Sequence, residues 1–156
     1  MADFYRWVEI ARKVNGRYLD AIASVPLTKP SRDILDPVSR PVVKKKLRYR
    51  ALRPVSIEDS RIFASIMRGE FHLRGFRNHD LRRPFFPDPP SSPIEAQQRA
   101  AYITRKIRLL RAHGIVRKVS GTTYYRVTRS GVAVMATALN LRNYDVNSLP
   151  LPGKTA

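Results

Sequence analysis

Apolar residues spaced three and four apart mark the first segment of the chain. Between Asp3 and Val25 they recur often enough to predict one amphipathic helix, which Pro26 ends because proline cannot continue a helix. The apolar stripe of this helix has two candidate partners, either the rest of the chain or another protein such as a second copy. We therefore expect residues 1–25 to form an N-terminal amphipathic helix.

Residues 26–55 lack this periodicity and form a Pro-rich basic linker or arm. Five prolines leave room only for a short helical turn around Ser31–Leu35. The sequence RPVVKKKLRYRALRP follows, and its alternation after Lys46 predicts an extended strand or arm with one basic edge. Two interpretations stay open. The segment is a solvated linker, or it contacts phosphates through Lys44, Lys45, Lys46, Arg48 and Arg50.

A segment with more regular apolar spacing, which we expect to be one domain, covers residues 56–142. Ser56 is the expected N-cap of its first helix, which Gly69 ends. EFHLRGF is expected to be a short extended link, and Asn78 is the expected cap of the brief helix HDLRRPFF. PDPPSSP then forms a loop.

A long helix, a hairpin and a last helix are expected to complete the domain. Pro93 favours the first turn of the long helix and Gly114 its end. IVRKV and TYYRV, separated by SGT, have the β-branched and aromatic residues of a hairpin. Thr128 is expected to cap the last helix, and residues 143–156 are expected to be a flexible tail.

The net charge of the chain indicates which class of partner it is expected to bind. The 156 residues include 30 Lys and Arg against 12 Asp and Glu, for a net charge of +18 at pH 7. So basic a chain is expected to meet a polyanion, and its Arg-rich composition suits phosphates and base edges. Nucleic acid is therefore the expected partner, in preference to a membrane surface.

The absence of cysteine excludes disulfides, thiolate catalysis and cysteine-based zinc sites. No window approaches the ~18 apolar residues of a membrane span. The charged N-terminal segment does not fit a secretory signal. We expect a cytoplasmic, nucleoid-associated protein.

The expected order over residues 56–142 is helix, short strand, helix, long helix, strand, turn, strand and helix. This order resembles the winged helix-turn-helix family, and the resemblance is carried by RGEFHLRGFRNHDLRRPFF, RAAYITRKIRLLRAHGIVRKV and SGTTYYRVTRSG. It implies a mainly α (α+β) fold with a recognition helix at about 94–113 and a two-stranded wing at about 115–128. VNGRYLDAIASV and RGEFHLRGFRNHDL are also similar to the C-terminal part of an uncharacterised bacterial protein family, which implies no activity.

The long helix has an apolar and a polar face at helical geometry. Ile103, Ile107 and Leu110 share the apolar stripe. On the polar face, Arg suits guanine and phosphate, Gln suits adenine, and Ala or Thr can contact a thymine methyl. Polar helix faces are commonly only solvated, but Glu95 is the sole acidic residue between Ser91 and Asn143.

In winged-helix docking the N-terminal half of the recognition helix meets the bases. The base-facing candidates are Gln97, Gln98, Ala101 and Arg105, with Thr104 on the same face. The phosphate-positioning candidates are Arg108, Arg111, Arg117 and Lys118, and the wing tip adds Ser120 and Thr122.

Enzyme chemistry is not expected. The three histidines have no metal-ligand spacing with carboxylates, and glycine-rich phosphate loops and serine nucleophile motifs are lacking. No catalytic residue, metal or cofactor is therefore expected. The leading hypothesis is duplex-DNA binding by a regulatory or mobile-element-associated protein. The alternative is an RNA-binding or scaffold subunit of a ribonucleoprotein or nucleoprotein complex.

Overall fold

The computed structural model describes residues 29–143, a mixed α+β structure as the sequence predicts. The helices are α2 (Ser31–Leu35), α3 (Ile57–Ile66), α4 (Gly69–Arg74), α5 (Asn78–Phe85), α6 (Pro93–Ala112) and α7 (Arg129–Asn143). The strands are β1 (Val42–Lys44), β2 (Leu47–Tyr49), β3 (Val116–Lys118) and β4 (Tyr125–Val127). They pair antiparallel as β1–β2 and β3–β4.

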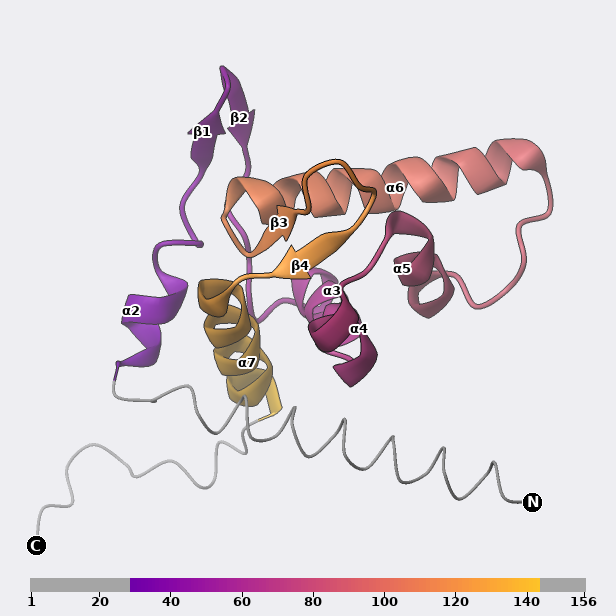
Figure 1. The fold of residues 1–156 in the computed structure, drawn as a ribbon. Helices are drawn as coiled ribbons and strands as arrows, with labels where there is room; N and C mark the ends of the chain where they lie inside the picture. Colours follow the sequence, from indigo (N-terminus) through magenta and orange to yellow (C-terminus); the bar gives the residue numbers. More distant parts are fainter. Residues whose placement is uncertain (1–28, 144–156) are drawn as a thin grey trace, which may run out of the picture.

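In the view of Figure 1 the long helix α6 runs across the upper part of the molecule, and α3, α4, α5 and α7 lie below it. The expected N-terminal helix at 3–25 and the expected tail after residue 143 lie outside the described residues. The short helical turn expected at Ser31–Leu35 is confirmed as α2.

Three helices begin at the caps that the sequence predicts. Ser56 Oγ accepts a hydrogen bond from Asp59 N at 3.3 Å, and Ser92 Oγ accepts one from Glu95 N at 3.2 Å. Thr128 Oγ1 accepts one from Gly131 N at 3.0 Å. Each cap satisfies a backbone N–H that has no partner within its helix.

The expected extended link EFHLRGF is wrong for most of its length, because Gly69–Arg74 form α4. A helix this short has no periodicity to detect. Only Phe76 pairs as a strand would, in an isolated antiparallel bridge to Tyr125. Gly75 permits the close approach, since its φ is 79° and an added Cβ would lie 2.6 Å from Tyr125 O.

The expected capping role of Asn78 is also wrong. Asn78 is the first residue of α5, and Arg77 is the N-cap, with Asp80 accepting a hydrogen bond from Arg77 N at 2.7 Å. The Asn78 amide instead connects two helices, because Nδ2 donates to Ala100 O at 3.0 Å and to Thr104 Oγ1 at 2.9 Å.

One apolar core joins α3, α5, α6 and α7. Its fully buried members include Phe63, Ile66, Leu81, Ile103, Leu110 and Met135. Val38 and Leu52, from the segment expected to be a linker or arm, are buried in the same core, and Leu52 N donates to Val38 O at 3.0 Å. The domain boundaries themselves stay a prediction.

Between Val38 and Leu52 the chain forms the hairpin β1–β2, in which Lys44 lies opposite Leu47. The strand expected after Lys46 is confirmed as β2. Lys45 and Lys46 form the two-residue turn with φ values of 49° and 63°, a left-handed conformation that Asn and Gly usually supply. The turn was not predicted, because two lysines carry no turn signal.

Candidate nucleic-acid interface

The polar face of α6 points away from the core. Gln97, Gln98, Thr104, Arg105, Arg108 and Arg111 are exposed, and Ala101 is half-buried. The apolar stripe on the opposite face packs inward, with Ile103 and Ile107 at 0% and 2% exposure. The helix is therefore amphipathic in the sense that its spacing predicts.

Thr104 differs from its neighbours on this face because its hydroxyl is already engaged. It donates to Ala100 O at 2.9 Å and accepts the bond from Asn78. Asn78 Oδ1 in turn accepts from Arg82 Nε at 2.9 Å. This chain of bonds holds α5 against α6, so the Thr104 hydroxyl serves the packing of the two helices.

A third face of α6 carries a buried cation. Lys106 is 7% exposed and its Nζ makes an ion pair with Glu58. The hydrogen bond from Lys106 lowers the pKa of the Glu58 carboxyl. Lys106 Nζ also lies 3.9 Å from Asp59 Oδ1 and 5.4 Å from the Tyr102 ring centroid. These contacts fix α6 to the first turn of α3.

Asp59, whose side chain is 1% exposed, is the centre of this network. Its carboxylate accepts two bonds from Arg50, at 2.6 and 3.0 Å, and one from Arg53 N at 2.7 Å. Burial alone would raise the pKa of Asp59, but the bonds from Arg50 and Arg53 hold it below its ordinary value. Arg50, an expected phosphate contact, is thus committed to an internal carboxylate.

Two further bonds attach the β1–β2 hairpin to the end of α6. Lys44 Nζ donates to Arg111 O at 3.4 Å. His113 Nε2 lies 2.8 Å from Arg50 O and must donate, because a carbonyl only accepts. The His113 Nδ1 atom is buried and has no partner among the described residues.

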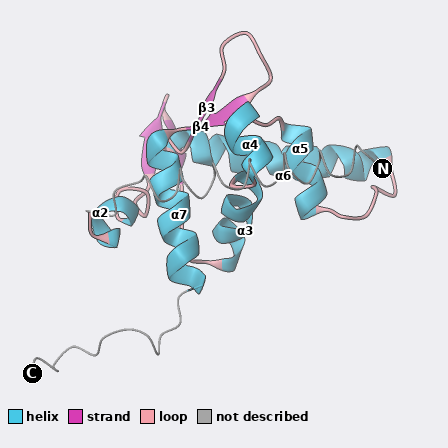
Figure 2. Cartoon of the chain, turned by 60° about the horizontal axis from the view of Figure 1, so that its bottom comes forward, coloured by secondary structure: helices cyan, strands magenta, loops and turns pink. Residues whose placement is uncertain are grey.

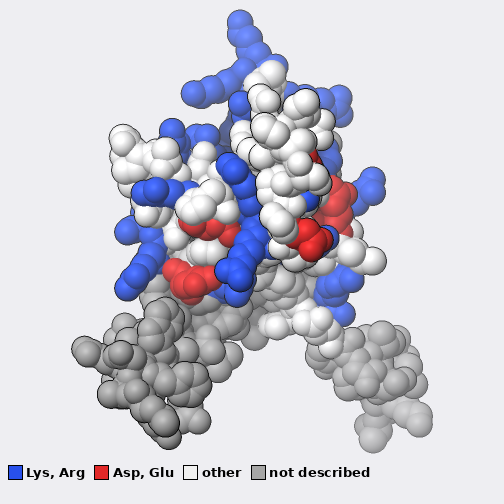
Figure 3. All heavy atoms as spheres, turned by 90° about the vertical axis from the view of Figure 1, so that its right-hand side faces the viewer, with Lys and Arg blue, Asp and Glu red and all other residues white. Residues whose placement is uncertain are grey.

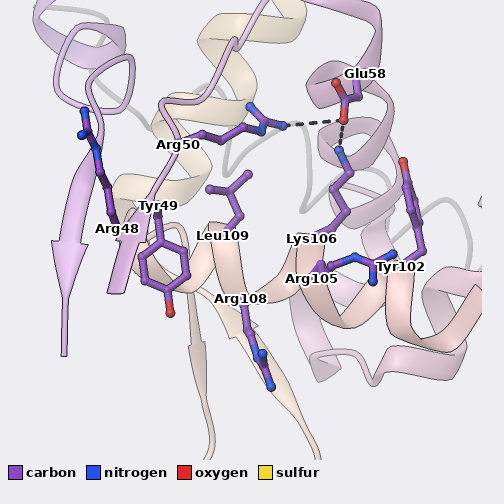
Figure 4. Close-up of a pocket in the computed structure, with 9 residues that line it drawn as sticks. All are labelled: Arg48, Tyr49, Arg50, Glu58, Tyr102, Arg105, Lys106, Arg108 and Leu109. Atoms are coloured by element: carbon purple, nitrogen blue, oxygen red, sulfur yellow. Dashed lines mark hydrogen bonds and ion pairs between the residues drawn. The ribbon is translucent and has the colours of Figure 1, made fainter. Parts of the chain in front are cut away.

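The hairpin and α6 together line a cleft of about 510 Å³. β2 contributes Arg48 and Tyr49, and α6 contributes Tyr102, Arg105, Arg108 and Leu109. Figure 4 shows Glu58 held between Arg50 and Lys106 at one end, while Arg108 extends away from that carboxylate. The cleft therefore brings Arg48, Arg105 and Arg108, three of the expected contact residues, around one opening.

The β3–β4 hairpin carries expected contacts as well. Arg117 and Lys118 are exposed on β3, and Ser120 and Thr122 are exposed in the connecting loop. Figure 2 shows this loop standing out from the helices between β3 and β4. Thr122 closes that loop, because its Oγ1 donates to Val119 O at 3.0 Å and accepts from Tyr124 N at 3.1 Å.

Two exposed arginines near this hairpin were missed from the sequence. Arg126 lies directly opposite Arg117 on β4. Arg77 lies over the Tyr124 ring, with its Cζ 4.2 Å from the centroid. The alternation in TYYRV could have indicated an outward-facing Arg126, since alternate strand residues share a face. No local signal connects Arg77 to Tyr124.

Cations and acids are unevenly distributed over the surface. Figure 3, whose top is that of Figure 1, shows Lys and Arg at the top and the acidic side chains lower down among further cations. Within residues 29–143 no three His, Cys, Asp or Glu side chains are placed to hold a metal ion. Nor does any helix of that range have the length and apolar character to cross a bilayer.

Comparisons of the chain with protein-family models, with curated proteins and with solved structures give no match.

Proposed function

We propose that the chain binds duplex DNA through a winged-helix domain at residues 56–142, with α6 as the recognition helix and β3–β4 as the wing. A bacterial regulatory or mobile-element-associated role, at the nucleoid, is part of this proposal.

The order of elements supports the fold assignment. The elements run α3, α4, α5, α6, the β3–β4 hairpin and α7, and the isolated bridge of Phe76 to Tyr125 lies between α4 and α5. Apart from α4 and α7, and with the bridge in the position of the first strand, this is the order of a winged helix, which has a helix, a strand, two helices and a two-stranded wing.

The observation that carries the proposal is the exposed face of α6. A row of Gln and Arg side chains runs along a helix of about 30 Å, and no acidic residue occurs from Ala96 to Asn143. A major groove admits an α-helix, and these side chains have the donors that read adenine and guanine. Among them, Gln98 and Arg105 have the most direct role in the proposal.

Selection of bound sequences from a random duplex pool tests the proposal, followed by titrations of the selected site against salt and structured RNA. Arg105→Ala should cost roughly 1–3 kcal/mol of binding free energy and relax one base preference. Arg32→Ala is the control, because Arg32 lies on α2 and its side chain is 78% exposed.

An unselective pool, together with unchanged duplex affinity of Arg105→Ala, would contradict the assignment of α6. Preference for structured RNA over the selected duplex at the same salt would favour the alternative function, an RNA-binding or scaffold subunit.

A further inference from the structure

We propose that the β1–β2 hairpin enters the minor groove next to the major groove that α6 occupies. One sugar–phosphate backbone would then pass over the cleft between β2 and α6. This inference rests on the proposed function and adds to it a second, separate point of contact with the duplex.

The hairpin is fixed relative to α6. A two-stranded hairpin is marginal by itself, but this one is joined to α6 by the bonds of Lys44 to Arg111 O and of His113 to Arg50 O. The Arg50–Asp59 pair attaches its outgoing strand to α3. Figure 1 shows the hairpin standing out beyond the C-terminal end of α6. The hairpin therefore projects from the molecule in a fixed position relative to α6.

The tip of the hairpin has the charge that a duplex requires. The sequence contains no acidic residue between Asp36 and Glu58. Lys45 and Lys46 occupy the turn, both exposed, although the left-handed backbone there disfavours side chains. Folding stability does not explain lysine at these two positions, because Asn-Gly would form the same turn with less strain.

Two exposed apolar side chains beside the tip favour contact with a groove over contact with phosphates alone. Leu47 follows Lys46 directly and is 59% exposed, and Val43 on the partner strand is 68% exposed. Proteins that bind the minor groove combine cations with apolar side chains that press between base steps. Leu47 is opposite Lys44 and Val43 is opposite Arg48, so the two apolar side chains lie on opposite faces of the hairpin. Phosphate contacts alone would leave both of them in water.

The cleft has room for the sugar–phosphate backbone that separates the two grooves. Adjacent major and minor grooves are separated by one sugar–phosphate backbone, so a protein that occupies both must leave room for that backbone. The cleft is about 510 Å³. Its acidic lining residue, Glu58, is paired with Arg50 and Lys106, and the lining also includes Arg48, Arg105 and Arg108. Within residues 29–143 these three guanidinium groups form no ion pair with a carboxylate.

A variant that keeps the turn and removes its charge tests the inference. Lys45→Asn with Lys46→Gly preserves a two-residue left-handed turn, so the hairpin should stay folded. On the selected duplex, the slope of log K against log salt should become shallower by about 1.8, because two phosphate contacts are lost. Hydroxyl-radical footprinting should lose the protected minor groove on one flank and keep the base preferences of α6.

A second variant, Leu47→Thr, separates the apolar contact from the charge. It should leave the salt slope unchanged. Apolar side chains that press between base steps kink the duplex, so this variant should bend the duplex less than the wild type does, as measured by gel phasing. Shortening the duplex on that flank should abolish the difference between the wild type and both variants.

The inference is overturned if the flank shows no protected minor groove, or if the turn variant binds the long duplex as the wild type does. It is equally overturned if the turn variant weakens binding to structured RNA but not to duplex DNA. Loss of affinity in Arg105→Ala alongside these results would leave the proposed function standing. Failure of the wild type to bind any duplex would end both proposals.

Discussion

Arg117 and Arg126 lie directly opposite each other on β3 and β4, and both side chains are exposed. Like charges in directly opposite positions destabilise an antiparallel pair. The β3–β4 hairpin therefore carries a repulsion that a polyanion between or beside the two side chains would relieve.

Replacing Arg126 should separate stability from binding. Arg126→Thr should raise the free energy of unfolding by roughly 0.2–1 kcal/mol at low salt, because the repulsion is removed. The same change should weaken duplex binding and make its salt slope shallower by about 0.9. Thermal denaturation and anisotropy titrations measure the two effects. Lower stability with unchanged binding would show that Arg126 has only a structural role.

Asp59 should make stability depend on acid pH. Its pKa is lower in the folded than in the unfolded chain, so its ionised form stabilises the fold above the unfolded value. That contribution is lost as the pH falls below about 3.9 and through the folded pKa. Asp59→Asn should therefore cost about 2–3 kcal/mol at neutral pH, and less in acid.

Glu58→Gln is the matched control, because the Glu58 side chain is 60% exposed and solvent screens its ion pairs. It should cost less than Asp59→Asn does, because the amide that replaces the carboxylate can still accept the hydrogen bond from Lys106, and Asp59 also lies beside Lys106. Urea denaturation across the acid range measures both variants. An equal loss for Asp59→Asn at pH 3 and pH 7 would contradict the ionised role of Asp59.

Gly131 should tolerate no side chain. A Cβ at this position would lie 2.1 Å from Ile115 O, a backbone atom, so α7 would have to move away from the start of β3. Gly131→Ala should destabilise the fold by about 2–3 kcal/mol. Gly114→Ala is the comparison, since a Cβ there meets nothing within 4 Å and only its φ of 73° is strained. A smaller loss for Gly131→Ala than for Gly114→Ala would show that α7 adjusts freely.

Replacing Thr104 should affect stability, whereas replacing Gln98 should affect base preference, although both residues were predicted on the polar face of α6. Thr104→Val removes the hydroxyl that accepts from Asn78, and should cost about 1 kcal/mol of stability with little change in base preference. Gln98→Ala should change the base preference with little change in stability. Selection from the duplex pool and thermal denaturation of both variants check this. A changed base preference in Thr104→Val at unchanged stability would contradict the packing role.

The long helix was predictable because its signals are local. Ser92, Pro93 and Gly114 mark its ends, and the apolar spacing through Ile103 and Leu110 defines its buried face. The β3–β4 hairpin was predictable for the same reason, from β-branched residues on both sides of a Gly-containing turn.

The rest depends on contacts between residues distant in sequence. Lys106 is buried beside the carboxylates of Glu58 and Asp59, which both come from another helix. Arg50 resembles every other cation of its basic run until Asp59 is placed beside it.

The hydrogen bond between Leu52 N and Val38 O has a consequence for how the molecule can vary. The chain leaves the core and returns to it at one place, and Arg50 holds the returning segment to Asp59, so only the tip at residues 45–48 can be exchanged without loss of these contacts. Lengthening such an excursion adds little closure entropy. A different tip could be grafted there while α3 and α6 keep their positions. Changes at the tip could therefore alter how far the hairpin extends and which duplexes it binds, without changes to the core.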